Sequence, residues 1–240
     1  MPNESMTFRI AAHLLVSVGF CVLTSASLQA QTWTETGDAG QTLGTAQAAG
    51  VIANQALNQI SGTISSATDA DLFRFTITAP TTFSATTTFG GLTTLDTALF
   101  LFNSSGAAIY TNDDASGASL QSTLPGGTSF TMSLAAGTYY LGISLSGNEP
   151  INLNSQLLFS PYIAGDSTSV RGAAGGINPN TLANFNGLTS FAETGSYRID
   201  LTSAATVPEP STVALGLVGA AALGAFIRKR RKSVRSPSII

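Results

Sequence analysis

The sequence predicts an all-β fold, an antiparallel β-sandwich of jelly-roll-like type with about nine short strands. Several segments alternate apolar and polar residues, which places the apolar side chains on one face of a strand. Turn-forming residues separate these segments at short intervals, as they do in β-sandwiches. Thr, Ser, Gly, Asn and Ala are abundant whereas Lys and Glu are scarce, and this composition favours strands and turns over exposed helices.

The expected strands lie between two apolar ends of the chain. Phe73, Phe75 and Ile77 alternate with polar residues, and a turn at 79–81 predicts a hairpin that joins this strand to residues 82–89. The segment 99–102 is apolar on both faces, which is typical of a central strand. The expected strands cover residues 60–64, 73–78, 82–89, 99–102, 107–111, 130–134, 139–143, 156–159 and 197–201.

Two segments of the body do not show this strand pattern. Residues 46–58 predict a short helical turn. Residues 165–186 are rich in Gly, Asn and Ser without periodicity, so we expect a long surface loop that is also a candidate contact surface. The folded body is expected to span residues 31–205, which is enough chain for one domain with a sizeable core.

Residues 1–30 have the pattern of a signal peptide, because Arg9 precedes an apolar segment and small residues lead to Ala30. Cleavage after Ala30 would remove Cys21 and His13, the only cysteine and the only histidine of the chain. The mature body would then contain no disulfide, thiolate nucleophile, Ser-His pair or His-ligated metal. The sequence therefore predicts an exported protein that is not an enzyme.

The charge of the body is strongly negative. Between residues 31 and 207, three arginines stand against eleven carboxylates, so the net charge is −8. Such a surface repels phosphate backbones, which argues against nucleic-acid binding. Divalent cations are its natural counter-ions.

The carboxyl end has three parts in order. Val207, Pro208, Glu209, Pro210 and Ser211 form a proline-rich stretch that interrupts regular structure. Residues 211–227 predict a transmembrane helix, and residues 233–240 form a tail. The basic cluster between them, which we expect on the cytoplasmic side, consists of Arg228, Lys229, Arg230, Arg231 and Lys232.

The predicted helix is short for a permanent anchor. The apolar run from Val213 to Ile227 reaches roughly 22 Å, against a hydrocarbon core of roughly 30 Å. Its many Gly and Ala residues contribute little transfer free energy, which favours a temporary stop during export. A lasting single-span anchor is the alternative.

This end of the chain, residues 206–232, resembles the PEP-CTERM sorting signal of Gram-negative bacteria. The resemblance implies that an exosortase recognises and cleaves the chain near Pro208, Glu209 and Pro210, while the helix lies in the membrane. The protein would then reach the cell envelope, the outer surface or the extracellular matrix.

The body also resembles a known family between about Gly62 and Ser144. The motifs are Asp69 to Phe75, Leu95 to Phe102, Asn112-Asp113-Asp114 and Ala135 to Leu141. Together they are similar to the bacterial pre-peptidase C-terminal type of β-sandwich. This resemblance implies a non-catalytic accessory or surface module.

Five aspartates are candidate calcium ligands. Asp69 and Asp71 are two residues apart, so both carboxylates point to one side of an extended strand, and Asp96, Asp113 and Asp114 in turns could converge on them. Calcium takes six to eight oxygen ligands, which suits this set. The alternative is that these aspartates cap turns by accepting hydrogen bonds from nearby backbone N–H groups.

The predicted function is therefore that of an exported, non-catalytic surface or matrix component with a structural or adhesive role. The alternative is a module that binds carbohydrate, such as exopolysaccharide, and that calcium stabilises. Exported sandwiches that bind sugars use aromatic platforms, and the candidates here are Tyr110, Tyr139, Tyr140, Tyr162 and Tyr197. The expected partners are an exosortase, the membrane during sorting, and exopolysaccharide or other surface proteins.

Overall fold

The protein is described by a computed structural model at residues 30–50, 54–87, 93, 95–162, 166–189 and 192–207. In these ranges the chain forms strands with a single short α-helix, which confirms the all-β class. Within them, no helix has the length and apolarity needed to cross a bilayer. The predicted signal peptide up to residue 29, Pro208 to Ser211, and the predicted helix, basic cluster and tail at 211–240 lie outside the described residues.

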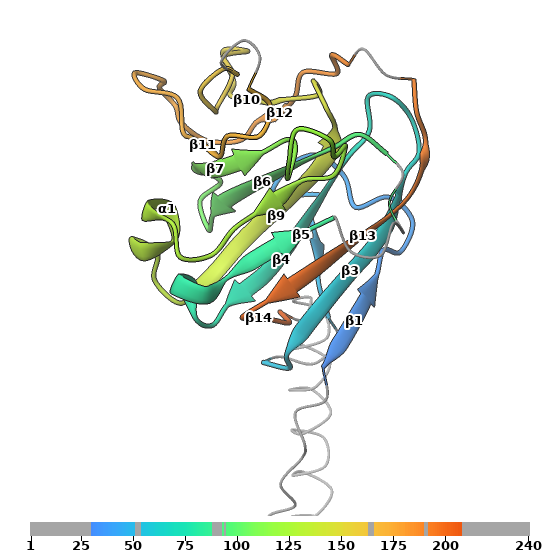
Figure 1. Cartoon of the computed structure of the whole chain (residues 1–240), viewed down its shortest axis with the longest axis vertical. Helices are drawn as coiled ribbons and strands as arrows, with labels where there is room; N and C mark the ends of the chain where they lie inside the picture. Colours follow the sequence, from blue (N-terminus) through green and yellow to red (C-terminus); the bar gives the residue numbers. More distant parts are fainter. Residues whose placement is uncertain are drawn as a thin grey trace, which may run out of the picture.

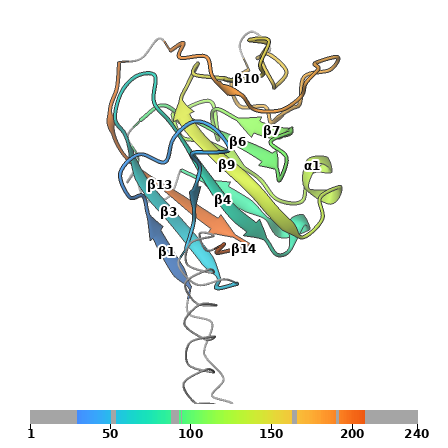
Figure 2. The same ribbon diagram turned by 180° about the vertical axis from the view of Figure 1, so that it is seen from behind.

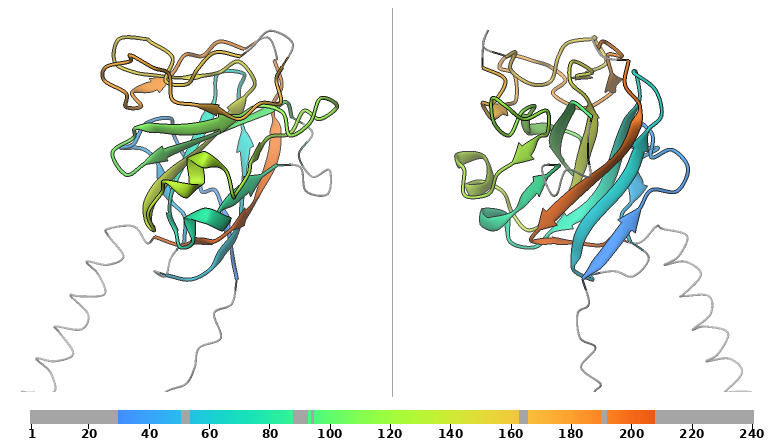
Figure 3. Two further views of the ribbon diagram at one scale, coloured as in Figure 1. Left: turned by 60° about the vertical axis from the view of Figure 1, so that its left-hand side comes forward. Right: turned by 45° about the vertical axis from the view of Figure 1, so that its right-hand side comes forward.

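The first sheet has five strands and forms one layer of the sandwich (Figure 1). In spatial order they are β1 (Gln31–Thr34), β3 (Leu57–Ile64), β13 (Gly195–Thr202), β5 (Ser84–Thr86) and β8 (Thr123–Leu124). All neighbours in this sheet are antiparallel except β1, which runs parallel to β3. The right-hand view of Figure 3 shows β1, β3 and β13 side by side on one face of the molecule.

The second sheet is built around the predicted central strand. Its spatial order is β11 (Arg171–Gly172), β7 (Ala108–Asn112), β6 (Thr97–Asn103), β9 (Gly137–Leu145), β4 (Ala70–Ile77) and β14 (Ala204–Ala205), and β2 (Gln47–Ala48) also pairs with β4. The β2–β4 pair is parallel, so the sandwich has two parallel pairs where the sequence predicted a purely antiparallel fold. A separate pair, β10 (Pro150–Ile151) with β12 (Asn184–Phe185), completes the described strands.

The main core lies between the two sheets. From β4 it takes Phe73, Phe75 and Ile77, as the alternating pattern predicted, and from β6 it takes Leu99 and Leu101. These side chains meet buried residues of the five-stranded sheet such as Ile60 of β3 and Ile199 of β13. The period-2 pattern of each strand therefore determines which side chains fill the sandwich.

A second apolar cluster covers the opposite face of the seven-stranded sheet. Phe100 and Phe102 of β6 point to this side, and the ring of Phe159 lies 5.7 and 5.6 Å from theirs. Leu182 and Phe185, from the segment predicted to be a surface loop, are buried here as well. The segment that carries β10, β11 and β12 thus forms an outer layer, seen beyond β7 in Figures 1 and 2. The expectation of a long surface loop at 165–186 did not include strands β11 and β12, because strands of two residues are too short to show a period.

The predicted hairpin between residues 73–78 and 82–89 is also wrong. The chain leaves β4, makes a 3-10 turn at η1 (Pro80–Thr82), and enters β5 in the other sheet. Pro80 has no N–H for a strand ladder, and its fixed φ favours the turn. Phe83 is then buried against Phe75, with the ring centroids 5.5 Å apart, so the crossing adds to the main core.

The segment 130–134 is not a strand, because a short helix, α1 (Ser129–Met132), replaces it. Thr128 and Thr131 form a capping box, in which each side-chain oxygen accepts a hydrogen bond from the other residue's backbone N–H. Phe130 stacks on Tyr110 at 5.5 Å while Met132 is exposed. The apolar residues at 130 and 132 therefore do not share one buried face, as they would in a strand.

Two further segments differ from expectation. Residues 156–159 form only isolated bridges, at Leu157 with Ile151 and at Phe159 with Ala173. In the predicted helical turn at 46–58, Gln47–Ala48 is strand β2 and Leu57 begins β3, while residues 51–53 lie outside the described part. The other predicted strands are confirmed with shifted ends.

Candidate functional site

The predicted calcium ligands gather at one end of the sandwich. In the register of the second sheet, Ala70 of β4 and Ala98 of β6 both lie opposite Ser144 of β9. Asp69 and Asp96, each of which stands one residue before its strand, therefore lie at the same end. β1 begins and β14 ends at the opposite end of the molecule, the lower end in Figures 1 and 2.

Three carboxylates at the acidic end form a compact group, which we call the Glu35 cluster. It consists of Glu35, Asp38 and Asp71, and one carboxylate oxygen from each lies within 4.8 Å of the other two. Asp71 was among the predicted calcium ligands, whereas Glu35 and Asp38 were not. Those two follow β1, and only the parallel pairing of β1 with β3 brings them beside β4.

Backbone groups and a tyrosine hold the Glu35 cluster in place. Glu35 Oε1 accepts a hydrogen bond from the N–H of Ala39 at 2.8 Å, and Oε2 accepts one from the N–H of Thr63 at 2.9 Å. Asp71 reaches across the sandwich, where its Oδ2 accepts a hydrogen bond from the hydroxyl of Tyr197 at 2.7 Å. These contacts fix two of the carboxylates before any ligand arrives.

Gly62 provides the space for this arrangement. It lies on β3 directly opposite Tyr197 of β13. A Cβ at this position would overlap both Glu35 Oε2 and the Tyr197 hydroxyl oxygen. A side chain at residue 62 would therefore displace the two groups that surround Asp71.

Asp71 is the electrostatic centre of the Glu35 cluster. It is fully buried, and its Oδ1 has no hydrogen-bond partner in the described part of the chain. Burial raises the pKa of Asp71 from 3.8 to about 8, the Tyr197 hydrogen bond opposes this, and the charges of Glu35 and Asp69 add to it. Burial and the Asp71 charge likewise raise the pKa of Tyr197. A cation beside Asp71 Oδ1 would favour the ionised carboxylate and so offset the free-energy cost of burying its charge.

We expect the cation-free protein to lose stability as the pH rises from 5 to 8. Below about pH 4, Asp71 is protonated in both the folded and the unfolded chain and has no effect. As the pH rises, the unfolded chain ionises first, so folding is increasingly disfavoured until the pH passes the folded-state pKa of about 8. Thermal melts in a chelating buffer at each pH measure this, and Asp71→Asn should make the loss of stability smaller. A melting temperature that rises between pH 5 and 8 would contradict the prediction.

A second acidic group, the Asp113 cluster, contains Asp96, Asp113 and Asp114. Burial raises the pKa of Asp113 to about 7, aided by Asp96, Asp114 and Glu149 and opposed by a hydrogen bond from Ser146 Oγ at 3.0 Å. Burial, Asp114 and Glu193 raise the pKa of Asp96 to about 6. The Oδ1 atom of each of the three aspartates is buried without a partner among the described residues. Their oxygens are not as close together as those of the Glu35 cluster, which alone among the described residues brings three within 4.8 Å.

Asp69 and Glu149 have structural roles instead. Asp69 Oδ2 accepts a hydrogen bond from the N–H of Ser65 at 2.6 Å, as expected of an aspartate that caps a turn. Glu149 forms a buried ion pair with Arg171 of β11 at 3.0 Å, and the Arg171 guanidinium lies 3.4 Å above the ring of Tyr162. This ion pair joins the outer layer to the turn that follows β9.

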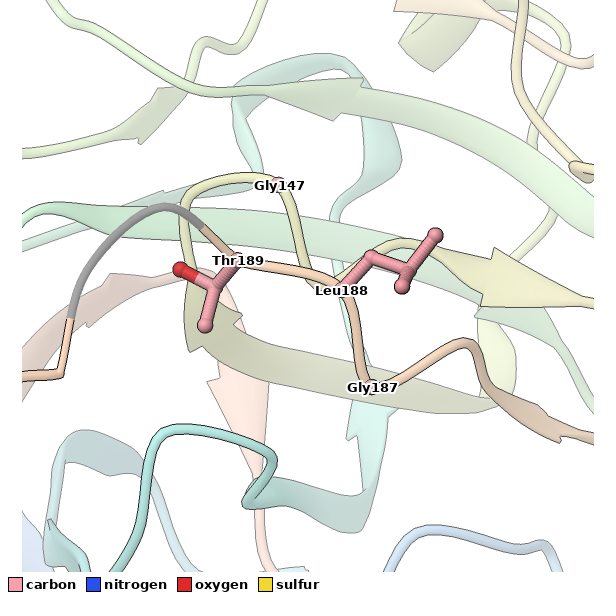
Figure 4. Close-up of a pocket in the computed structure, with 4 residues that line it drawn as sticks. All are labelled: Gly147, Gly187, Leu188 and Thr189. Atoms are coloured by element: carbon pink, nitrogen blue, oxygen red, sulfur yellow. The ribbon is translucent and has the colours of Figure 1, made fainter.

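None of the five tyrosines predicted as platforms for sugar binding is fully exposed. Tyr110, Tyr139 and Tyr197 are buried, and Tyr140 and Tyr162 are half-buried. An open pocket of about 320 Å³ lies near the acidic end, lined by Gly147, Gly187, Leu188 and Thr189 (Figure 4). None of these four residues, which line the pocket in the described part of the chain, carries an acidic, basic or aromatic side chain.

The fold and the site define an acidic β-sandwich module. Comparison with known families supports the β-sandwich part of this description. The model of the bacterial pre-peptidase C-terminal domain matches residues 69–145, the stretch from the start of β4 to the end of β9. The model of the PEP-CTERM protein-sorting motif matches residues 206–232, directly after β14. Both resemblances are thus confirmed, and neither family is catalytic. Among curated proteins, no relative matches the chain.

The sorting motif indicates where the protein goes. Motifs of this kind indicate export, a transient membrane anchor and exosortase-dependent sorting to the cell surface. Of the predicted processing residues, only Val207 lies in the described part of the structure.

Proposed function

We propose that this protein is an exported, non-catalytic component of the cell surface or extracellular matrix, released from its membrane anchor by an exosortase. The observation that carries the proposal is the sorting motif at residues 206–232, which begins at the residue after the last strand. Its role at the surface is structural or adhesive. Exopolysaccharide and other surface proteins are the partners that this role implies.

The position of the chain ends supports this arrangement. The first strand begins and the last strand ends at one end of the sandwich, and the two acidic clusters lie at the other. While the C-terminal segment lies in the membrane, the acidic end therefore faces away from it. Ligands in the surrounding space can reach this end before and after release.

Sorting is tested by comparing the native producer with a strain that lacks its exosortase. We expect the mature protein of the first strain to have lost both terminal segments by intact mass, and the protein of the second to keep its C-terminal segment and stay with the membrane fraction. Glu209→Gln should behave like the exosortase deletion. Asp166→Asn, which removes the same charge from a half-buried turn of the body, should be processed normally. Equal mass and location in both strains would refute the proposal.

The Glu35 cluster favours a second role, which is calcium binding. Calcium–oxygen distances of 2.3–2.6 Å place two ligands of one ion at most about 5 Å apart, and the three carboxylate oxygens meet this limit. Asp71 Oδ1, buried and without a partner among the described residues, is the atom that such an ion would satisfy. An ion held by Glu35, Asp38 and Asp71 would connect the segment after β1 to β4 of the second sheet. For the Asp113 cluster, calcium remains a weaker proposal because its oxygens are farther apart.

A further inference from the structure

The first residues of the sorting motif are built into the folded body. Thr206 has an exposed fraction of only 1%. Its N–H donates to the carbonyl of Gln55 at 2.9 Å, and its carbonyl accepts a hydrogen bond from the N–H of Asn54 at 3.1 Å. The N–H of Val207 donates to the carbonyl of Ala49 at 3.1 Å. The motif therefore does not begin in a free linker.

Side chains strengthen this attachment. Thr206 Oγ1 accepts a hydrogen bond from the N–H of Gln55 at 3.1 Å. Gly50 has a φ of +113°, a conformation that other residues rarely adopt, and a Cβ there would overlap Cβ and Cγ2 of Thr206. Glycine at residue 50 thus leaves the space that the Thr206 side chain fills. We call these contacts of Thr206 and Val207 with Ala49, Gly50, Asn54 and Gln55 the tail clamp.

The tail clamp ends immediately before the residues to be processed. Pro208 follows Val207, and an extended chain spans only about 10 Å from Val207 to Pro210. Proteins that bind a peptide as an extended segment form hydrogen bonds with its backbone N–H and C=O groups. The backbone groups of Thr206 and Val207 cannot make such hydrogen bonds while they are bonded to Ala49, Asn54 and Gln55.

We propose that the tail clamp controls processing, so that the exosortase acts only on chains in which Thr206 and Val207 have detached from the body. This inference rests on the proposed function. In the reaction, the peptide C–N bond breaks, the acyl group passes to water or another nucleophile, and the amine of the released segment takes up a proton. The body remains folded throughout, and only the clamp opens.

Opening the tail clamp from the body side should accelerate processing. The added Cβ of Gly50→Ala would overlap the side chain of Thr206, while every residue of the sorting motif stays unchanged. Loss of one or two kcal/mol raises the open population by a factor of about 5 to 30, so we expect precursor conversion in the full chain to speed up about fivefold or more. Gly176→Ala is the matched control, because Gly176 also has a positive φ, +75°, but nothing within 4 Å of the added Cβ. It should be processed at the rate of the original protein.

Closing the tail clamp should have the opposite effect. Ala56 and Ala205 face each other in an antiparallel bridge just before the motif, and the hydrogen bond from Thr206 to Gln55 makes them a non-hydrogen-bonded pair. Such pairs have Cα atoms about 4.5 Å apart, which suits a disulfide. The double variant Ala56→Cys/Ala205→Cys should be processed at least fivefold more slowly when oxidised, and reduction should restore the rate.

Pulse-chase labelling in the native producer, with and without its exosortase, distinguishes the outcomes. Faster conversion of Gly50→Ala and slower conversion of the oxidised double variant support the clamp, and if Gly50→Ala fails to fold, the double variant alone decides. If both variants are converted at the original rate in an exosortase-dependent manner, the clamp is refuted while the sorting function stands. Conversion that does not depend on the exosortase would refute the function itself.

Discussion

Replacing Asp71 with asparagine is expected to abolish the response of the protein to calcium. In the original mature protein, a calcium concentration of 100 times the dissociation constant should stabilise the fold by about 2.7 kcal/mol, a rise in melting temperature of about 5–10 °C. The amide that replaces the carboxylate can still accept the Tyr197 hydrogen bond but supplies no charge to the ion. Without calcium at pH 8, the variant should melt no lower than the original, because it no longer buries an ionisable carboxyl group.

Asp69→Asn is the matched control for this experiment. Its carboxylate accepts a hydrogen bond from Ser65 and does not belong to the Glu35 cluster. This variant should lose some stability with and without calcium, yet keep most of the calcium response, because the three carboxylates of the Glu35 cluster are unchanged. Melting curves with calcium and with chelator, measured for all three proteins, give the comparison. A calcium response that survives in Asp71→Asn, or is missing in the original protein, would exclude the site.

Phe100→Ala is expected to cost about 3–5 kcal/mol, although Phe100 lies on the face of the sheet turned away from the main core. The ring of Phe100 is fully buried, 5.7 Å from Phe159 and 5.6 Å from Phe185 of the outer layer. Its removal leaves a cavity between β6 and this layer. The melting temperature should fall by about 6–20 °C, and the segment 166–189 should become more sensitive to proteases.

Phe130→Ala serves as the comparison for this loss. Phe130 is half-buried and stacks on Tyr110 at the edge of the main core, so its truncation should cost clearly less. The two variants remove the same side chain from different environments. If Phe100→Ala cost no more than Phe130→Ala, the outer layer would be a loosely attached loop rather than part of the fold.

Residues 99–102 show which features of a strand the sequence could predict and which it could not. Apolar residues at every position predicted a central strand covered on both faces, and β6 is such a strand. What covers the second face could not be predicted, since β11 and β12 are two-residue strands without a period and Leu182 and Phe185 stand alone among polar neighbours. The failed strand at 130–134 has a related cause, because a capping box with alternating neighbours resembles a strand over so few residues.

The residues of the candidate site were likewise predicted only in part from the sequence. Asp69 and Asp71 were predicted from their spacing of two residues on a strand, and the other aspartates from their positions in turns. Glu35 and Asp38 were missed because they belong to the site only through the pairing of β1 with β3. No local sequence pattern predicts this parallel pairing. A glutamate and an aspartate three residues apart around a glycine turn were the only sequence signal.

The sequence by itself determined the strand-rich class, the faces of the long strands, the acidic charge of the body and the sorting motif. Each is encoded locally, in composition, in a period of two or in a contiguous motif. Only the tertiary structure decided which carboxylates share a site, what covers the second sheet, and that Thr206 and Val207 are attached to the body. These features join residues tens to more than a hundred positions apart, and their energies depend on register and burial, which no short segment specifies.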